Sequence, residues 1–377
     1  MKVSHYLCRT ETDWADVGRG FEGKPDLLLV FGKRELLPRF YAHMAQRFPG
    51  VPVLGCSTAG EISDTKVVDD AVTATLIGFA KTRIRLARCG SVKQADSRSA
   101  GVRLAEALNG PDLRHLFVLS DGLCVNGSDL VEGLRAALPP AVSITGGLAG
   151  DGTGFQATSV IADAPPEGDI VAALGFYGDG LQVSYGSLGG WDPFGPDRLI
   201  TRAQGNVLFE LDGQPALALY KRYLGEHAAG LPATALLFPL ELRSGSGDED
   251  GLVRTILAVN EAEGSMTFAG EMPEGSYARL MKANFDRLID GATGAAAMAL
   301  GAAAGAGPEL AVLISCVGRK LVLQQRIEEE VEQVREVLGS RPVLTGFYSY
   351  GEISPHRPAA RCQLHNQTMT ITTFSET

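Results

Sequence analysis

Short apolar runs alternate with apolar stripes at helical spacing in the N-terminal part of the chain. Residues 26–31 form a run with the composition of a strand buried on both faces. Apolar positions then recur every three or four residues, which predicts an amphipathic helix: Leu36, Leu37, Phe40, Tyr41, Met44 and Phe48. Gly50 ends this helix, and residues 52–54 open a second strand that leads into the glycine-rich segment 55–63. The pattern predicts a strand–helix–strand unit.

The same pattern returns in the middle of the chain. Residues 116–119 predict a strand, and an apolar stripe over 130–138 predicts a helix with Ser128 as its expected N-cap. A second strand at 141–144 leads into another glycine-rich segment, 145–152. We interpret these residues as a second copy of the unit.

A third copy lies near the C-terminus and begins with a predicted strand at 310–314. Its helix carries a stripe of apolar residues: Leu323, Ile327, Val331, Val334 and Leu338. Gly339 ends the helix, and a strand at 342–344 leads into residues 345–354. The first and third copies share Pro-Val-Leu followed by Gly-Glu-Ile-Ser, which indicates internal duplication. Two unrelated buried strands would explain the first motif but not the second.

Further strands are predicted in segments of alternating character at 71–89, 169–187 and 363–374, and a hairpin is predicted over 252–270. An amphipathic segment at 216–224, preceded by Pro215, predicts a helix between two domains. The expected fold class is therefore α/β, with mixed sheets built from repeated βαβ units and added antiparallel hairpins. We expect two pseudo-equivalent domains, at residues 1–220 and 221–377.

Charge and composition narrow the partners and the location. The net charge of −10 makes nucleic acid and anionic membrane surfaces unfavourable partners, since both repel an acidic protein. The N-terminal residues 1–14 lack the apolar stretch of a signal peptide, and the Ala/Gly-rich run 291–307 is too weakly hydrophobic for a spanning helix. We expect a cytoplasmic protein, and a homo-oligomer is compatible with the sequence.

The six cysteines are scattered without a Cys-x-x-Cys pair, which excludes a zinc knuckle and a dithiol redox motif. Catalytic motifs are also missing from the sequence. Residues 55–59 lack the second glycine of a G-x-S-x-G elbow, and no phosphate-binding loop or G-x-G-x-x-G motif follows a strand. Cys56 is a candidate thiolate at a strand end, although a cysteine in such an apolar run is usually a core residue. We expect a protein that is not an enzyme, with a thiol-dependent enzyme using Cys56 as one alternative.

Glycine-rich ends of buried parallel strands are common ligand sites, because exposed backbone amides and helix ends converge there. The chain has three such ends, and Glu61 and Glu352 hold equivalent places in two of them. Each glutamate suits either a ligand amine or an arginine, or it serves as a structural acceptor for backbone amides. The glycines themselves suit either a shared cleft or tight turns alone.

Four of the six histidines, at positions 5, 43, 115 and 227, lack neighbours suited to a metal and fit surface or satisfied core positions. His356 lies in a Pro-rich, Arg-containing loop and is expected to be exposed. His365 lies in a polar, strand-like segment. In a strand, Cys362 and His365 point to opposite faces, so they do not chelate one ion together. His365 is therefore either a lone metal ligand or a hydrogen-bonded residue that fixes the C-terminal strand.

These motifs together resemble the FIST family of sensory proteins, which have an N-terminal and a C-terminal FIST domain. The resemblance rests on five short segments that span most of the chain in order: residues 55–61, 145–151, 210–213, 346–352 and 364–368. It implies a small-ligand sensor that acts on a separate signalling partner, commonly a histidine kinase or a cyclic-dinucleotide enzyme. It also implies that some members bind haem and sense nitric oxide, while others bind small molecules such as amino acids.

The residues and the resemblance leave two ligand classes open. Non-covalent haem b would need an axial nitrogen, for which His365 is the candidate, since no Cys-x-x-Cys-His is present. A small polar metabolite such as an amino acid would instead be held by Glu61, Glu352 and Arg254. The complete set of predicted ligand-binding residues is Cys56, Ser57, Gly60, Glu61, Gly146, Gly147, Arg254, Tyr348, Tyr350, Glu352 and Asn366.

Overall fold

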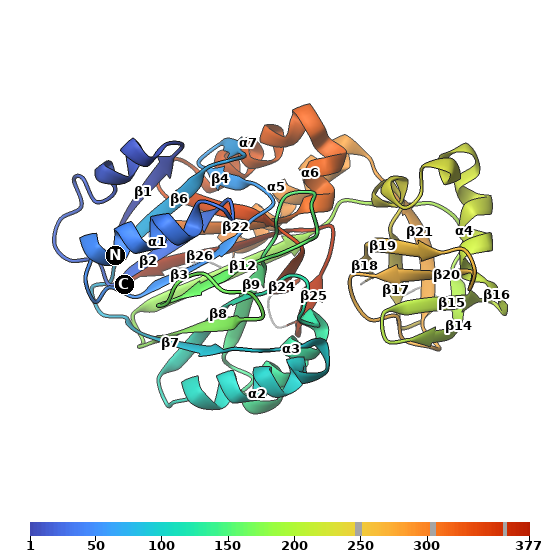
Figure 1. Cartoon of the computed structure of the whole chain (residues 1–377), viewed down its shortest axis with the longest axis horizontal. Coiled ribbons are helices and arrows are strands. Elements are labelled where there is room, and N and C mark those ends of the chain that lie inside the picture. The colour runs from blue at the N-terminus through green and yellow to red at the C-terminus, as the bar shows by residue number, and fades with distance from the viewer. Residues whose placement is uncertain (246–250, 302–306, 357–359) are drawn as a thin grey trace.

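The computed structural model describes residues 1–245, 251–301, 307–356 and 360–377. A larger body contains three sheets with helices on their outer faces, and a smaller β-rich body lies at one end of it (Figure 1). The chain leaves the larger body after β12, builds the smaller body, and returns at α5.

All three predicted strand–helix–strand units are confirmed, and in each unit the two strands pair in parallel. Their elements are β2 Leu27–Gly32, α1 Leu37–Arg47 and β3 Val53–Ser57; β8 Leu113–Ser120, α3 Gly127–Ala137 and β9 Ser143–Leu148; and β22 Leu310–Cys316, α7 Ile327–Leu338 and β23 Val343–Ser349.

Two local predictions about these helices are wrong. The N-cap of α3 is Asn126 rather than Ser128, because the Asn126 side chain accepts hydrogen bonds from the backbone amides of Ser128 and Asp129 at 3.0 and 3.2 Å. The third helix is interrupted: Leu323 ends a separate helix, α6 Val317–Leu323. Gln324 follows with a φ of 49°, which turns the chain into the short helix η5 Gln324–Arg326 before α7 begins.

Each unit sits at the centre of its own sheet. The first sheet has the order β1 Lys2–Cys8, β6 Val72–Gly78, β2, β3, β10 Val160–Ala162. The second has the order β25 Cys362–His365, β24 Gly351–Pro355, β9, β8, β11 Val171–Tyr177, β7 Arg83–Cys89. The third has the order β12 Leu181–Leu188, β26 Met369–Glu376, β22, β23, β4 Glu61–Ser63, β5 Lys66–Val68.

The three sheets exchange strands in a ring. The strand that follows β3 in the chain is β4, which pairs with β23 of the third sheet. In the same way β24, which follows β23, pairs with β9, and β10, which follows β9, pairs with β3. The carboxyl ends of the three parallel pairs are therefore brought toward one region of the body.

The strands predicted in the alternating segments form, but the members of each segment belong to different sheets. β6 and β7 lie in the first and second sheets, β11 and β12 in the second and third, and β25 and β26 in the second and third. The hairpin within 252–270 is confirmed as β19 Ile256–Asn260 with β20 Ser265–Phe268, whereas β18 Leu252–Arg254 pairs with β17 Leu240–Arg243. Alternation specifies a half-buried strand but not its partner.

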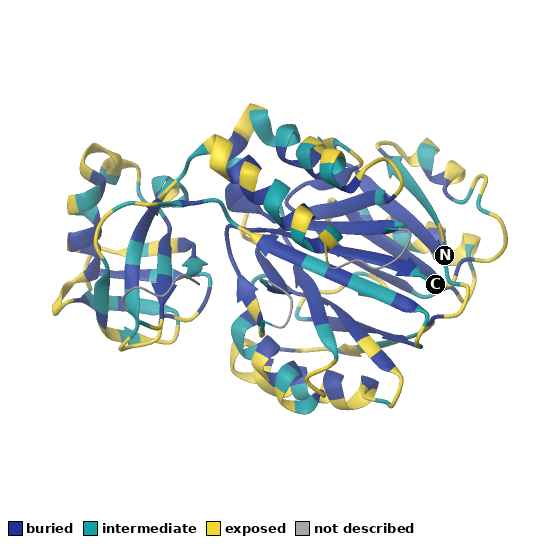
Figure 2. Cartoon of the chain, turned by 180° about the vertical axis from the view of Figure 1, so that it is seen from behind, coloured by how far each residue is buried: buried dark blue, intermediate teal, exposed yellow. Residues whose placement is uncertain are grey.

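The central strands of each sheet in the larger body are buried and the outer helix faces are exposed (Figure 2). Side chains from all three sheets meet in a central core, where the rings of Phe31 and Phe347 lie 4.7 Å apart. Helix α1 covers the first sheet, α2 Ser97–Leu108 and α3 cover the second, and α5 Phe285–Gly301 and α7 cover the third. Short helices η1 Glu11–Asp16 and η2 Gln94–Asp96 lie in connecting segments.

The smaller body has its own core and contains the helix predicted to join two domains. Its elements are β13 Asp192–Pro193, β14 Arg198–Gln204, β15 Val207–Leu211, β16 Gln214–Pro215, α4 Ala216–Leu224, η3 Gly225–Gly230, η4 Ala233–Leu237, β17 to β20, and β21 Tyr277–Lys282. The interdomain role expected for α4 is wrong, since its apolar face packs on this sheet rather than between bodies. Residue 220 lies inside α4, and the domain boundary there stays a prediction.

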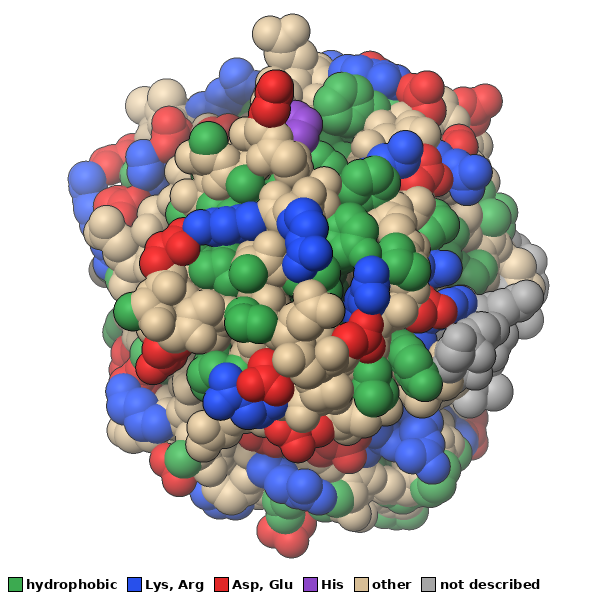
Figure 3. Space-filling view, turned by 90° about the vertical axis from the view of Figure 1, so that its right-hand side faces the viewer, with side chains coloured by type: hydrophobic (Ala, Val, Ile, Leu, Met, Phe, Trp, Pro, Cys, Tyr) green, Lys and Arg blue, Asp and Glu red, His purple; other side chains and the backbone are tan. Residues whose placement is uncertain are grey.

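Acidic, basic and apolar side chains are interspersed on the face of the smaller body that points away from the larger one (Figure 3). The chain termini lie side by side (Figure 1), and the Met1 ammonium pairs with Glu309 at 3.0 Å and with Glu376 at 3.5 Å. In the described part of the chain, no helix is both long and apolar enough to cross a bilayer.

Candidate functional site

A cavity of about 800 Å³ lies where the carboxyl ends of the parallel strands converge. Its walls come from residues 33–35 after β2, 58–61 after β3, 151–154 and 156 after β9, and helix α6 after β22, together with Asp69 and Asp70. We call it the strand-end cavity. All three units contribute to it, but the predicted glycine-rich ends do so only in the first two, since no residue of 346–351 lines the cavity.

Glu61 is the most unusual side chain on the wall of this cavity. It is 1% exposed, and its Oε1 accepts a hydrogen bond from Thr58 Oγ1 at 2.5 Å. Its other oxygen, Oε2, is buried and has no hydrogen-bond partner among the described residues. Burial raises the pKa of Glu61 to about 8, and the Asp69 charge adds to the rise, while Thr58, Lys320 and the nearby backbone amide of Ala71 oppose it. A buried carboxyl oxygen without a donor favours a ligand that supplies one.

Lys320 brings a positive charge into the same wall from α6. Its Nζ donates to the carbonyl of Ala59 at 2.9 Å, forms an ion pair with Asp69, and lies 5.6 Å from the centre of the Tyr348 ring. Lys33 and Arg34, at the end of β2, line the cavity as well and are about half exposed. The cavity therefore presents both signs of charge.

Asp151 shapes the loop between β9 and β10. One oxygen accepts from the backbone amide of Phe155 at 2.8 Å and from the Tyr350 hydroxyl, and the other accepts from the amides of Gln156 and Ala157, both at 2.8 Å. These donors lower the pKa of Asp151 against the opposing effect of its partial burial. The loop is thus held in a defined shape against the cavity.

Glu352, the equivalent of Glu61 in the third copy, is a structural acceptor. Its Oε1 accepts from Ser349 Oγ at 2.7 Å, and its Oε2 accepts from the amide and hydroxyl of Thr368 at 3.2 and 2.9 Å. It is fully buried, which raises its pKa to about 8, and it is not among the residues that line the strand-end cavity.

The glycines at the strand ends divide into two kinds. A Cβ on Gly146 would lie 1.9 Å from the carbonyl oxygen of Val118, and the equivalent glycines, Gly55 and Gly346, meet the neighbouring strand just as closely, at 2.1 and 1.8 Å. Close packing against backbone or core atoms explains why these positions, and Gly147 beside Ile314, carry glycine, so no ligand contact is needed to explain them. Gly60 differs, because it lines the strand-end cavity beside Lys320.

Cys56 and Ser57 point into the protein. The Cys56 thiol lies in the central core, and burial raises its pKa well above the usual range. Ser57 is completely buried, and its Oγ accepts from the backbone amide of Ser159 at 2.9 Å. A buried thiol with a raised pKa is a poor nucleophile.

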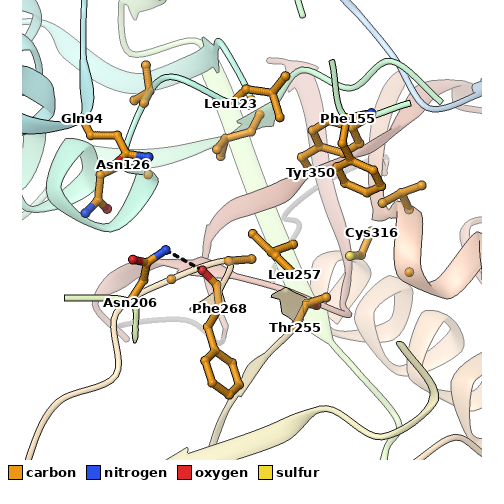
Figure 4. Close-up of a pocket in the computed structure, with 18 of the residues that line it drawn as sticks. Gln94, Leu123, Asn126, Phe155, Asn206, Thr255, Leu257, Phe268, Cys316 and Tyr350 are labelled. Carbon is orange, nitrogen blue, oxygen red and sulfur yellow. Dashed lines mark hydrogen bonds between the residues drawn. The ribbon is translucent and has the colours of Figure 1, made fainter. Parts of the chain in front are cut away.

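None of the remaining predicted residues lines the strand-end cavity, although the backbone of Tyr348 pairs with Ala59 and Gly60, next to Glu61. Tyr348 is buried and donates to Glu330 Oε1 at 2.7 Å, and Asn366 is also buried, away from the cavity lining. Arg254, on β18 of the smaller body, donates to the carbonyl of Leu364 at 2.9 Å and so ties that body to β25. Tyr350 lines a smaller pocket between the two bodies (Figure 4).

His365 lies on β25, where Nε2 is 2.8 Å from the carbonyl oxygen of Ser354. A carbonyl only accepts, so Nε2 carries the proton, and burial lowers the pKa of the ring to about 4. The adjoining cavity, of about 420 Å³, has Glu241, Arg287 and Asp290 in its lining. Haem needs a free axial nitrogen and an apolar slot. The residues around His365 do not fit haem, and its role as a haem ligand stays a prediction.

Lys320, Asp69 and Asp151 are site residues that the sequence reasoning missed. Asp151 follows Gly150 as Glu61 follows Gly60 and Glu352 follows Gly351, so an alignment of all three copies would have found it. Lys320 and Asp69 carried no such signal, because their positions depend on how distant segments pack.

Comparison with known proteins places the chain in a family. A FIST N domain model matches residues 26–214, and a FIST C domain model matches residues 216–355. An uncharacterized protein of Methanocaldococcus jannaschii is 26% identical over 282 residues, which cover 68% of this chain and 53% of that protein. The chain thus spans about half the length of that relative. A crystal structure of cyanuric acid hydrolase from A. caulinodans aligns with 100% of this chain and 98% of its own, at 10% identity and a TM-score of 0.37, which is too distant to bear on fold or activity.

Proposed function

The chain belongs to the FIST family, and from that premise we propose that it is a sensor whose strand-end cavity binds a small zwitterionic metabolite such as an amino acid. The observation that carries the proposal is the buried Glu61 carboxyl group, which has an unpartnered oxygen on the cavity wall. A ligand ammonium group would supply the missing donor and a compensating charge.

The charges around Glu61 favour a ligand that carries both signs. Glu61 lies at the buried end of the wall, whereas Lys33 and Arg34 lie where the cavity meets solvent. In the free protein these two cations pair with the exposed carboxylates of Asp70 and Glu35. A ligand carboxylate would replace those partners while its ammonium group reaches Glu61. Glu352 and Arg254, which the sequence suggested as further contacts, take no part in this arrangement.

Binding rather than catalysis is the better-supported role for this site. The cysteine considered as a nucleophile, Cys56, is in the central core with a raised pKa and does not line the cavity. We therefore propose that the chain is not an enzyme.

The family resemblance also supplies the proposed output, which is a separate signalling protein such as a histidine kinase in the cytoplasm. Co-purification of kinase candidates with the chain, in the presence and absence of the bound amino acid, tests this part by itself. Ligand-dependent association supports it, and ligand-independent behaviour of every candidate counts against it.

A thermal-shift screen of the common amino acids, followed by calorimetry, tests the ligand. Free ligand at a hundredfold excess over Kd stabilises the native state by about 2.7 kcal/mol, which is easily measured as a higher Tm. We expect Glu61→Gln to weaken binding about tenfold or more, because the charge-assisted contact is lost. Glu22→Gln, at an exposed site away from the cavity, is the matched control and should bind as the wild type does. The proposal fails if no amino acid raises Tm, or if Glu61→Gln binds normally.

A further inference from the structure

We propose that the pocket between the two bodies is a second ligand site, which takes an uncharged, planar molecule of one ring bearing an amide or similar hydrogen-bonding group. We call it the interdomain pocket. It shares one lining residue, Val317, with the neighbouring strand-end cavity, and the inference does not depend on the function proposed there.

The walls of the interdomain pocket come from both bodies (Figure 4). Leu123, Phe155, Cys316 and Tyr350 belong to the larger body, while Thr255 and Leu257 belong to the smaller one. Its volume is about 120 Å³. An apolar protein cavity of roughly 150 Å³ holds a benzene molecule, so this pocket is of the size for a single ring.

Charge separates the interdomain pocket from the strand-end cavity. None of the described residues that line the interdomain pocket is an aspartate, glutamate, lysine, arginine or histidine. A charged ligand placed there would lose its hydration without gaining a partner, which is strongly unfavourable. The lining therefore selects a neutral ligand.

An aromatic platform gives the pocket a surface for a flat ligand. The rings of Phe155 and Tyr350 are stacked, with centres 4.4 Å apart and planes inclined by 14°. Phe155, on the larger body, is 41% exposed, and Leu257, on the smaller body, is 45% exposed; both side chains line the pocket. Large apolar side chains left open on both sides of a pocket favour an apolar occupant between them.

A buried polar side chain in the lining of the pocket lacks a hydrogen-bond partner. Thr255 is 5% exposed, and its hydroxyl oxygen is buried without a hydrogen-bond partner among the described residues. The backbone carbonyl of the same residue accepts from Ala269 at 2.9 Å, which fixes the position of the side chain on its strand end. A ligand amide both donates and accepts, so it satisfies the hydroxyl in either orientation. Because the two walls belong to different bodies, the bound molecule ties them together.

Benzamide and nicotinamide are suitable probes, since each joins one planar ring to a neutral amide. We expect at least one of them to give saturation-transfer signals with the full-length chain and to bind with millimolar or better affinity. Benzoate and benzylamine, of similar size but charged, should bind at least tenfold more weakly. Failure of both amides to bind, or equal binding of the charged analogues, would overturn the proposal.

Two variants assign the binding to this pocket. Thr255→Val removes the hydroxyl and keeps the shape; loss of an unpartnered buried hydroxyl does not destabilise the fold, so Tm should hold while amide affinity falls about fivefold. Thr267→Val, on β20 of the same body and outside the pocket, is its control. Phe155→Ala should weaken binding as well, whereas Phe285→Ala, another exposed phenylalanine, should not. Wild-type affinity in both Thr255→Val and Phe155→Ala would refute the assignment.

Discussion

Glu61 and Glu352 hold equivalent positions in the first and third repeats, but their carboxyl groups meet different surroundings. Every oxygen of Glu352 accepts a hydrogen bond from the protein, whereas Oε2 of Glu61 accepts none from the described residues. Only Glu61 lines the strand-end cavity. Both repeats therefore contain a buried glutamate at this position, and Glu61 is the one that has a carboxyl oxygen available to a ligand.

Ligand binding at Glu61 should depend on pH. The pKa of Glu61 is raised to about 8 in the free protein, so the carboxyl group is mostly protonated at pH 7. A ligand ammonium group favours the ionised form, and binding below pH 8 must release a proton. We expect amino-acid affinity to rise with pH by up to about tenfold per unit and to level off above pH 8. Calorimetry in phosphate and in Tris at pH 7 should report release of close to one proton.

Glu61→Gln supplies the control for this pH dependence. Glutamine does not titrate, so the residual affinity of the variant should be independent of pH between 6 and 8. A wild-type profile as flat as that of the variant would exclude Glu61 as the group that receives the ammonium.

Stability should fall as the pH rises from 7 to 8. Glu61 and Glu352 both have pKa values raised to about 8 from an unperturbed 4.5. Unfolded glutamate is already ionised at pH 7, while the folded protein still holds these protons, so the stabilisation present at low pH is lost as pH passes through the folded pKa. The free energy of unfolding should drop by about 1–2 kcal/mol across this unit.

Buried histidines act in the opposite direction but at lower pH. Burial lowers the pKa of His5 and His365 to about 4 each and lowers that of His115 to about 3, so stability is lost as pH falls below 6.5. Urea unfolding of the wild type, Glu61→Gln and the Glu61→Gln/Glu352→Gln double variant at pH 7, 7.5 and 8 isolates the contribution of the two glutamates. Each substitution should remove about half of the decrease in unfolding free energy between pH 7 and pH 8. An unchanged decrease in the double variant would show that these two residues do not cause it.

The sequence predicted the three units well because their signals are local. An apolar run, a helical stripe and a stop glycine are decided by neighbours a few residues apart. The exchange of strands between sheets could not be predicted in this way. Gly-Glu-Ile-Ser after β3 indicates a strand, but its partner is β23, which lies near the other end of the chain. Nothing in the four residues specifies that pairing.

The strand-end glycines should tolerate no side chain. Gly146→Ala would place Cβ 1.9 Å from the Val118 carbonyl oxygen, and a φ of 151° adds strain. We expect a loss of at least about 3 kcal/mol in the free energy of unfolding, since two backbone strands must move apart. Gly110→Ala, where Cβ would meet only the Tyr177 ring at 3.7 Å, should change stability by less than about 1 kcal/mol. Similar losses from both substitutions, measured by urea unfolding, would disprove the packing argument.

Asp151 should matter for both cavities, because its loop contributes Gly152 and Gln156 to the strand-end cavity and Phe155 to the interdomain pocket. Asp151→Ala leaves three loop amides without their acceptor, which we expect to cost about 2–3 kcal/mol. Affinities for amino acids and for benzamide should both fall. Asp16→Ala, which loses only an exposed pair with Arg19, is the control. Retention of both affinities in Asp151→Ala would show that Asp151 does not hold the loop in the shape that either site needs.

Only part of the candidate site could be predicted. Gly60 and Glu61 follow from the repeated motif, and they do line the cavity. Cys56 and Ser57 stand beside them in sequence but are buried on opposite faces of β3, Cys56 in the central core and Ser57 against the backbone amide of Ser159. The charge of Arg254 suits a ligand carboxylate, but its partner in the structure is the carbonyl of Leu364 on β25. Side-chain direction and long-range packing decide these cases.

Arg319 should anchor the smaller body to the larger one. It is completely buried, with Nε and Nη2 donating to Glu330 Oε2 at 3.0 and 2.8 Å. Its remaining donors reach the carbonyls of Gly189, where the chain leaves the larger body, and of Leu288, at the start of α5 where it returns. Glu330 is satisfied in turn by Ser315 and Tyr348. The Arg319–Glu330 ion pair therefore links the two segments where the chain passes between the bodies to the core of the third unit.

Removal of this guanidinium should have two measurable effects. Arg319→Met leaves the Glu330 charge buried and unpaired, which we expect to lower the free energy of unfolding by about 3–5 kcal/mol. It also frees the two carbonyls, so amide hydrogen exchange at residues 189–192 and 285–289 should accelerate more than in the central strands. Arg326→Met, which breaks only exposed pairs with Glu329 and Asp286, should cost about 1 kcal/mol or less. If Arg319→Met destabilised the protein without faster amide exchange in these two connecting segments, Arg319 would be a core residue of the third unit and not an anchor of the smaller body.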